Sequence, residues 1–505
     1  MRRGLFEELK EYSAGDYYPF HMPGHKRNPE SGPLAKAYSF DLTEIDGFDN
    51  LHQAEGILKS AQEYAAEIYC SQKTYFLVNG STAGILSAVS ALSGRGRKLL
   101  IARNCHKAVY HAALLNHFEI DYLYPEENKA FGISCGITTE QVQEKLEQIE
   151  REEKVSADNC RVIAGIVLTS PTYEGILSDV RGIVETAHRR GIPVVVDQAH
   201  GAHFGFYPGF PESAVKEGAD LVVHSVHKTL PAPTQTALLH HNGTLIEREN
   251  VEKYLRIYQS SSPSYPLMAG IDCCMELLER EGRRRLEALL MHRRELEREL
   301  KGLRHIRIYP SSEGERQNEE ETKRFAADVQ EAGKLLISVR GTGVTGHELY
   351  EILRRDYRLQ MEMCGADYVL GILTMMDREE GFIRLRKALI ETDEVFCAKE
   401  HKAEEIFLPH YQNWQPKSVL RIDEAFVAQS EYVPPDAAEG RIAADFVNLY
   451  PPGIPVLVPG EQVENRILQM IGEYVRCGYT VQGLGGEKTG QRHCVKVIRD
   501  SMENK

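Results

Sequence analysis

Between residues 46 and 278, short runs of aliphatic and β-branched residues alternate with longer stretches of helical periodicity. The runs predict buried strands at 74–78, 98–102, 162–168 and 194–197, and the stretches between them predict helices at 83–92, 107–116 and 180–190. Parallel strands need a crossover connection, which a helix supplies, so the alternation predicts a mostly parallel sheet covered on both faces. Ligands bind such sheets where the strands end.

The remainder of the chain predicts further domains, because 505 residues exceed the usual size of one core. A charged stretch at 279–303 has apolar residues at helical spacing and predicts a long helix that leaves the large domain. The stretches after it predict a small α+β domain, with strands at 335–339, 359–363 and 368–375 and helices at 347–355 and 381–391. A predicted helix at 462–475 belongs to a last α+β segment. The expected parts are an N-terminal arm (1–45), a large domain (46–278), a small domain (279–395) and a C-terminal domain (396–505).

Composition excludes several kinds of partner. The net charge of -14 argues against a nucleic-acid surface, and the apolar runs are too short to span a bilayer. The ten cysteines are scattered without a Cys-x-x-Cys pair, and the first residues form no apolar leader segment. We therefore expect a cytoplasmic protein that binds neither nucleic acid nor membrane.

Two polar residues at the ends of apolar runs carry most of the functional information. Asp197 closes the run 194–196, and Lys228 follows the run 221–223 in Ser225-Val-His-Lys228. A lysine held there can form a Schiff base with the aldehyde of pyridoxal phosphate, and a nearby carboxylate can keep the pyridine nitrogen of that cofactor protonated. A surface lysine and a strand-end aspartate that meet by chance are the alternative.

A phosphate site would complete such a cofactor pocket. Residues 78–84 predict a strand end, a tight glycine turn and a helix start that Ser81 or Thr82 caps. Free amides at the positive end of a helix dipole bind phosphate. Capping alone explains Gly-Ser-Thr equally well. The predicted phosphate ligands are Gly80, Ser81, Thr82, Ser225 and His227.

Histidines form the next layer of the predicted site. His106 follows a predicted strand, so its imidazole could lie flat against the cofactor ring and help to move a proton, or it could be a polar surface residue. Ala199, His200 and His203 follow Asp197 closely and should lie near the ring oxygen of the cofactor. The alternative of a metal site would use His200, His203, His224 and His227. It lacks a His-Glu-x-x-His pattern and leaves the phosphate-type turn unexplained, so we expect no metal.

A turn after the predicted strand 162–168 adds a further candidate. Ser170-Pro-Thr-Tyr-Glu-Gly175 places a hydroxyl and an aromatic ring at the pocket rim, which makes Thr172 a candidate substrate contact. An ordinary turn explains the segment equally well.

With these residues assembled, the chain resembles the Orn/Lys/Arg decarboxylase family, which has the aspartate-aminotransferase-like (type I) pyridoxal-phosphate fold. It looks like the short form, without the N-terminal receiver-like domain of longer members. The matching segments run from residue 21 to about 460 and are His21-Met-Pro-Gly-His-Lys26, 41–52, Asn79-Gly-Ser-Thr82, Arg103-Asn-Cys-His-Lys107, Asp197-Gln-Ala-His-Gly201, His224-Ser-Val-His-Lys228, Ser261-Ser-Pro-Ser-Tyr-Pro266 and Tyr450-Pro-Pro-Gly-Ile-Pro455.

The resemblance implies roles for the matched residues. Lys228 would be the Schiff-base lysine, Asp197 the partner of the pyridinium and His106 the residue that stacks on the ring. Ser81, Thr82, Ser225 and His227 would hold the phosphate. The resemblance further implies that Ser262 reaches the phosphate of a neighbouring subunit, so that a homodimer, or a higher oligomer built from it, shares the active site.

The implied reaction is decarboxylation of a basic L-amino acid to a diamine or agmatine, with release of CO2. Arginine is the favoured substrate, lysine is close behind and ornithine is third. Lys228 or His227 would return a proton to Cα. A buried substrate cation needs a carboxylate partner, for which Asp41, Glu44 and Asp46 are candidates, although solvated loop acids are the plainer explanation for at least two of them.

Two other classes of protein remain open. Another type I pyridoxal-phosphate enzyme, such as an aminotransferase, aldolase or other lyase, would share Lys228 and Asp197 but not the arm motif or the Pro-Pro-Gly segment. A non-catalytic cofactor-binding protein would have lost the lysine or the phosphate turn, and both are present here.

Overall fold

The structure of the chain is a computed structural model. It describes residues 3–154, 162–309, 329–398, 415–450, 453–476, 478–485 and 493–499. Within these residues no helix is both long enough and apolar enough to cross a membrane.

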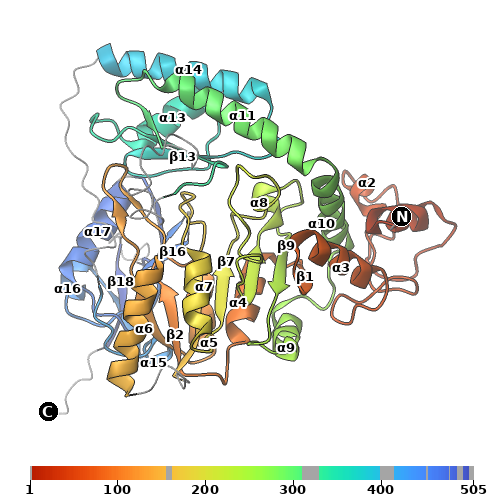
Figure 1. The fold of residues 1–505 in the computed structure, drawn as a ribbon, viewed down its shortest axis with the longest axis horizontal. Coiled ribbons are helices and arrows are strands. Elements are labelled where there is room, and N and C mark those ends of the chain that lie inside the picture. The colour runs from red at the N-terminus through yellow and green to blue at the C-terminus, as the bar shows by residue number, and fades with distance from the viewer. Residues whose placement is uncertain are drawn as a thin grey trace.

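The large domain is built on a seven-stranded sheet in which one strand, β9, runs opposite to the others (Figure 1). The central strands pair in parallel, as the alternation of strands and helices predicts. In sheet order the strands are β1 (Lys73–Leu77), β9 (Ala237–His241), β8 (Leu221–His224), β7 (Val194–Asp197), β6 (Ile163–Thr169), β2 (Lys98–Ala102) and β3 (Glu119–Leu123).

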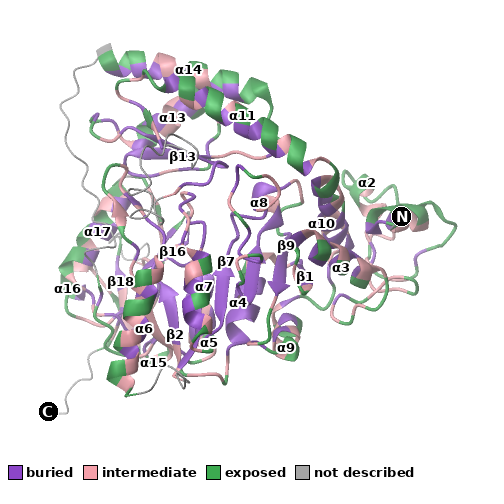
Figure 2. Cartoon of the chain, viewed as in Figure 1, coloured by how far each residue is buried: buried purple, intermediate pink, exposed green. Residues whose placement is uncertain are grey.

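Both faces of this sheet are buried, which explains the apolar runs. Along β1 and the residue that follows it, Tyr75 and Leu77 pack into one core cluster, whereas Phe76 and Val78 pack into the other. Successive side chains of a strand point to opposite faces, so alternate residues serve the two cores. Figure 2 shows the strands as an almost continuous buried layer. The helices of this domain are α3 (Ile57–Tyr69), α4 (Gly80–Ser90), α5 (Lys107–Leu115), α6 (Thr139–Glu153), α7 (Val180–His188), α8 (Val226–Thr229), α9 (Arg248–Tyr258) and α10 (Tyr265–Leu277).

The N-terminal arm contains a helix that the turn-rich sequence did not predict. Helix α1 (Leu5–Ala14) buries Leu5 and Leu9, and the Leu5 amide donates to the Asp272 carboxylate of α10 over 2.8 Å. A one-turn helix, α2 (Ala35–Tyr38), follows it. The arm is therefore anchored on the large domain.

The small domain is a four-stranded antiparallel sheet with helices outside it, as expected. Its strands, in sheet order, are β10 (Arg307–Ile308), β11 (Lys334–Ser338), β13 (Tyr368–Ile372) and β12 (Met363–Cys364). The outer helices are α11 (Arg283–Leu300), α13 (Gly346–Asp356) and α14 (Glu379–Ala398). A π-helical turn, η2 (Leu278–Gly282), joins α10 to α11. The isolated bridge between Ile176 and Gln330 joins this domain to the loop after β6.

One strand of the small domain was predicted wrongly. The run 359–363 was expected to be a strand, but β12 begins only at Met363. Arg358 has a left-handed backbone with φ 54°, and the Leu359 amide donates to the Leu353 carbonyl of helix α13. Residues just after 358 therefore still form the turn that ends this helix, not a strand.

The C-terminal part packs its own core from two small sheets and helix α17. The strand β18 near the chain end pairs with β14, so the last segment completes a sheet. Its elements are α15 (Ile422–Val427), β14 (Ser430–Val433), α16 (Pro435–Ala438), β15 (Val447–Tyr450), β16 (Ile454–Leu457), α17 (Asn465–Arg476), β17 (Thr480–Gln482) and β18 (Val495–Ile498). The segment 399–414, which follows the predicted boundary between residues 395 and 396, lies outside the described residues, and the domain boundaries stay predictions.

A fully buried arginine ties this part to the large domain. Arg103, just after β2, donates to the Pro455 carbonyl over 2.6 Å and pairs with the buried Glu461 at 3.4 Å. The Lys107 amide donates to the Gly453 carbonyl over 2.9 Å. The C-terminal part is thereby held against the carboxyl edge of the large sheet.

Candidate active site

The carboxyl edge of the large sheet holds a cavity of about 550 Å³. Residues from the large domain, the small domain and the C-terminal part all line it, the last through Tyr450 and Ile454. Nine of the predicted site residues line this cavity: Gly80, Ser81, Thr82, His106, Asp197, Ala199, His200, His227 and Lys228.

Asp197 and Lys228 come from neighbouring parallel strands. Asp197 ends β7, and Lys228 follows β8 in the short helix α8. Burial raises the pKa of the Asp197 carboxyl and lowers the pKa of the Lys228 amine, while their mutual attraction opposes both shifts. Burial thus makes it easier for Lys228 to be a neutral nucleophile, and a cationic ring nitrogen next to Asp197 would favour the charged form of its carboxyl.

The phosphate turn lies at the start of α4, but its capping was predicted wrongly. The helix begins at Gly80, whose φ of +75° suits glycine, and Asn79 occupies the cap position without a side-chain cap bond. Ser81 and Thr82 therefore lie inside the first turn. Since neither hydroxyl is the cap, both can serve a ligand in the cavity.

Ser225 provides the observation that tests the fit of a phosphate. Its hydroxyl is fully buried and has no hydrogen-bond partner among the described residues. A buried hydroxyl without a partner costs free energy that a bound anion would recover. Next to it, His227 shares a hydrogen bond between Nδ1 and the Thr236 carbonyl at 2.9 Å, and burial lowers its pKa. Nδ1 is therefore the donor, which leaves Nε2 of a neutral ring as an acceptor.

His106 is fixed as the N-cap of helix α5. Its Nδ1 accepts a hydrogen bond from the Ala108 amide at 3.2 Å, so its neutral ring carries the proton on Nε2. Burial and the nearby Lys228 lower its pKa to about 3. A side chain at Gly453 would come within 3.1 Å of this ring, so the glycine lets the C-terminal loop cover His106.

Of the remaining histidines of the alternative metal site, His200 contacts Lys228, whereas His203 and His224 lie in the buried core. His224 and His240 are hydrogen-bonded to each other at 3.1 Å inside the buried core, and His203 contacts Glu331 at 3.2 Å. Among the described residues, no group of three or more His, Cys, Asp or Glu side chains is arranged to hold a metal ion.

Several predicted residues lie away from the cavity of this chain. Thr172 is buried and lines a smaller neighbouring cavity instead, and its hydroxyl accepts from the Ile176 amide of its own turn at 3.1 Å. Asp41 contacts His25 at 3.2 Å in the arm, and Glu44 and Asp46 lie in the same arm segment. Ser262 is exposed. The roles given to these residues stay predictions.

Two residues of the small domain that the sequence did not single out lie at this cavity or next to it. Glu362 lines it and accepts a hydrogen bond from the Tyr173 hydroxyl. Lys334, at the start of β11, is fully buried and lies 2.7 Å from His200. The sequence offers one signal for Lys334, because this lysine directly precedes the apolar run 335–337 of a predicted strand. Nothing in the local sequence marks Glu362.

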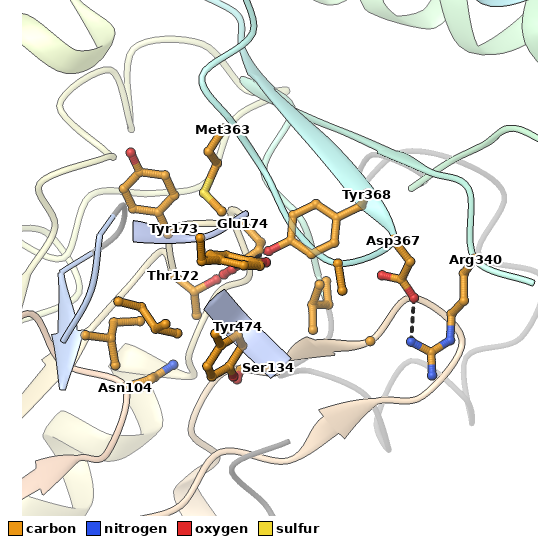
Figure 3. A pocket seen from close by; sticks show the side chains of 16 residues that line it. Asn104, Ser134, Thr172, Tyr173, Glu174, Arg340, Met363, Asp367, Tyr368 and Tyr474 are labelled. Carbon is orange, nitrogen blue, oxygen red and sulfur yellow. Dashed lines mark hydrogen bonds and ion pairs between the residues drawn. The ribbon is translucent and has the colours of Figure 1, made fainter. Parts of the chain in front are cut away.

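A smaller cavity of about 80 Å³ adjoins the first and shares Asn104, Tyr173 and Ile454 with it. Figure 3 shows how residues from three parts of the chain meet there. The Arg340 and Asp367 side chains form an ion pair at 2.7 Å, and the Tyr368 hydroxyl donates to Glu174 at 3.1 Å. These charged groups thus already have partners within the protein, whereas the Ser225 hydroxyl has none among the described residues.

The fold and the site together define a pyridoxal-phosphate-dependent enzyme of the type I fold. A lysine and a carboxylate at adjacent strand ends, the first turn of α4 and the orphan Ser225 hydroxyl fit the amine, ring-nitrogen and phosphate partners that this cofactor needs.

The chain belongs to the Orn/Lys/Arg decarboxylase family. The model of the family's major domain matches residues 3–380, and that of its C-terminal domain matches residues 408–499. Two similar proteins are arginine decarboxylases. That of Bacillus subtilis (strain 168) is 32% identical and covers 98% of both chains, and that of Bacillus anthracis is 31% identical and covers 95% of this chain and 94% of its own.

A solved structure has the same fold. The lysine decarboxylase of Francisella novicida superposes with a TM-score of 0.81 at 21% identity, over 98% of this chain and 81% of its own. The chain is therefore a pyridoxal-phosphate-dependent decarboxylase that acts on a basic amino acid. The predictions of family, fold class, cofactor and enzyme class are confirmed.

Proposed function

We propose that this enzyme decarboxylates L-arginine to agmatine. The observation that carries the proposal is Glu362, a carboxylate that lines the same cavity as Lys228 and lies on the small domain rather than on the sheet edge. A guanidinium matches a carboxylate through two parallel hydrogen bonds, which favours arginine over lysine. Full-length similarity to two arginine decarboxylases supports the same substrate.

The residues of the site divide the work between holding and protonation. When bound, pyridoxal phosphate supplies an aldehyde that links to an amine and a ring that accepts the electrons left by departing CO2. Lys228 would hold the aldehyde, Asp197 the ring nitrogen, and Gly80, Ser81 and Ser225 the phosphate. His106 would cover the ring face.

Protonation of the product falls to Lys228 or His227. Loss of CO2 leaves a carbon that must gain one proton, and both side chains line the cavity with lowered pKa values. A lowered pKa makes the protonated Lys228 amine a readier donor near neutral pH, whereas the neutral His227 ring would first have to take up a proton at Nε2. Tyr173 would hold the Glu362 carboxylate in place for the distal cation.

Side-by-side assays of CO2 release from arginine, lysine and ornithine test the substrate. We expect kcat/KM for arginine to exceed that for lysine by about 100-fold, because a site built for a planar cation leaves hydrogen bonds unmade with an ammonium. A preference for lysine or ornithine would refute the arginine proposal.

Replacing Glu362 with glutamine is expected to raise KM for arginine about 100-fold, because loss of one partner of a charged pair costs about 3 kcal/mol. Absorbance from bound cofactor should persist, since Lys228 and Asp197 are unchanged. Steady-state kinetics and a visible spectrum measure both effects. The matched control is Glu174→Gln, whose carboxylate bonds Tyr368 in the smaller cavity and should alter KM far less. Equal KM increases in the two variants would argue against Glu362 as the cation partner.

We also propose that the working enzyme is a cytoplasmic homodimer in which Ser262 reaches the partner's phosphate. The arm exposes the large side chains of Tyr17, Tyr18, Phe20 and Met22, which a second copy would cover. The cysteines are scattered along the sequence without a Cys-x-x-Cys pair, as is typical of a protein from a reducing compartment. Size-exclusion chromatography with light scattering, together with activity assays of the eluted fractions, tests the oligomeric state. An active species of 57.0 kDa, the mass of one chain, would contradict the homodimer.

A further inference from the structure

His200 lies between two lysines that come from different domains. Its Nε2 is 3.0 Å from the Lys228 amine, and its Nδ1 is 2.7 Å from the Lys334 amine. Both ring nitrogens are therefore engaged, each by an amine, and the imidazole forms the bridge between them.

The need to match donors with acceptors restricts which of Lys228, His200 and Lys334 can be protonated at the same time. A neutral imidazole has one N–H donor and one bare nitrogen, whereas a charged lysine can only donate. If both lysines were charged, one ammonium would face the imidazole N–H. Burial and the two neighbouring lysines lower the pKa of His200 well below its usual value, so the ring is neutral. One lysine must then donate to the ring, and the other must accept from it.

The small domain holds Lys334 in this position by backbone contacts. The Glu331 amide donates to the Gly175 carbonyl at 2.9 Å, which fixes the start of β11 on the loop after β6. Gly175 has φ +95°, and a Cβ there would lie 2.4 Å from Cγ of Lys334, so the glycine leaves room for the lysine stem. The amine lies 5.2 Å from the centre of the Tyr173 ring, a cation–π contact.

Lys334 is buried without an ion pair to a carboxylate among the described residues. Burial and the repulsion of Lys228 lower its pKa to about 8, while Glu331, Glu362 and Glu174 act in the opposite direction. The other charged or titratable groups that act on the bridge are His106, His227 and Asp197, the last through its attraction to Lys228. A buried amine of this kind usually destabilises a protein, so its presence beside the site needs a functional reason.

We propose that Lys334 and His200 form a proton relay to Lys228, with Lys334 as a positioning residue that acts through the imidazole. When Lys334 is charged, it donates to Nδ1, and the proton on Nε2 points at a neutral Lys228. For transfer, an N–H bond of Lys334 breaks as Nδ1–H forms, and Nε2–H breaks as a new N–H bond forms on Lys228. Lys334 ends neutral, Lys228 ends charged, and the imidazole stays neutral with its proton on the other nitrogen.

The relay answers a demand of the reaction, and in this respect it rests on the proposed function. Each decarboxylation replaces a carboxylate with a hydrogen and so consumes one proton. A charged Lys334 at neutral pH can supply that proton to Lys228 without opening the cavity to water.

The test measures the pKa of Lys228 in cofactor-free protein, from the pH dependence of its acetylation by acetic anhydride followed by peptide mass spectrometry. Lys334→Met removes the charge that directs the imidazole N–H at Lys228, so the pKa of Lys228 should rise by about 1 unit or more. Lys334→Arg keeps that charge at every pH and should leave the pKa of Lys228 at or below the parent value. Lys98→Met, on the opposite edge of the sheet, is the matched control and should change nothing.

Turnover provides the second measurement. Both Lys334 variants should lose about 100-fold in kcat, because neither methionine nor an arginine that stays charged can release a proton. An unchanged Lys228 pKa in folded Lys334→Met protein, an increase in Lys334→Arg, or parental turnover in Lys334→Arg would each overturn the relay. Since the labelling uses no substrate, its outcome is independent of whether arginine is the substrate.

Thermal unfolding checks that Lys334→Met is folded. The burial of the Lys334 charge also predicts the direction in which the melting temperature should change. Below pH 8 the folded parent holds a buried charge that the unfolded chain keeps in water, so Lys334→Met should melt at or above the parent temperature at pH 7. The gap should narrow as pH rises from about 8 towards 10.5, where the parent amine loses its proton in both states. A clearly lower melting temperature at pH 7 would contradict the unpaired burial of this amine.

Discussion

Replacement of Lys228 by alanine is expected to abolish the visible absorbance of protein incubated with pyridoxal phosphate and to lower kcat on the order of 10⁴-fold or more. Alanine removes the amine that would hold the cofactor aldehyde and one of the two candidate donors to Cα. The phosphate and ring partners remain, so the apoprotein should still bind the cofactor weakly. A visible spectrum and single-turnover CO2 release measure the two losses.

The matched control for this variant is Lys98→Ala. Lys98 begins β2 at the amino edge of the same sheet, where it pairs with Asp121 at 3.2 Å. Its loss should leave the absorbance and turnover close to the parent values. A Lys228→Ala protein that keeps its absorbance, or a wild-type protein that stays colourless with the cofactor, would refute the assignment of Lys228.

Replacement of Asp197 by asparagine should retain cofactor binding but lower kcat about 10³-fold. Asparagine has nearly the same shape and preserves the bond with the Ala199 amide, whose partner Oδ1 lies 3.2 Å away. It carries no charge, however, and so cannot keep the ring nitrogen protonated in a site where Asp197 is only 5% exposed. The measurement is steady-state CO2 release together with the visible absorbance of the bound cofactor.

Asp220→Asn is a control of the same chemistry at the other edge of the sheet. Asp220, which lies just before β8, is also buried, but it accepts from the Val194 amide at 2.8 Å and from His188 at 2.9 Å. Its replacement should lower the melting temperature while the active molecules turn over normally. Near-normal turnover in Asp197→Asn would show that the ring nitrogen does not need this carboxylate.

The parts of the fold that could be predicted were those that local patterns encode. Strand ends at Asp197 and before Lys228 followed from short apolar runs, because both faces of the large sheet are buried and no polar residue can interrupt them. Helix starts were less predictable. Ser81 and Thr82 are typical caps, yet the chain enters α4 earlier, through Gly80, whose φ of +75° lies in the left-handed region that glycine tolerates.

The candidate site likewise contains residues that could be predicted from local sequence patterns and residues that could not. Residues at the carboxyl edge of one sheet, such as Asp197 and Lys228, were predictable because parallel strands bring their ends together. Glu362 and Lys334 were not, because a single sequence does not report how the small domain docks on that edge. The arm acids Asp41 and Glu44 were predicted as candidate acceptors, and the folded chain adds Glu362, which lines the cavity.

By itself, the sequence determined which class of chemistry to expect, because a lysine, an aspartate and a phosphate turn at strand ends together indicate the same cofactor in any arrangement of domains. The tertiary structure decided which groups surround that lysine. His200 was visible from the start, but its meaning depended on a second lysine 134 residues away in the chain. Side-chain charge is written in the sequence, whereas burial and hydrogen-bond partners, which set whether that charge is kept, arise only when distant segments pack together.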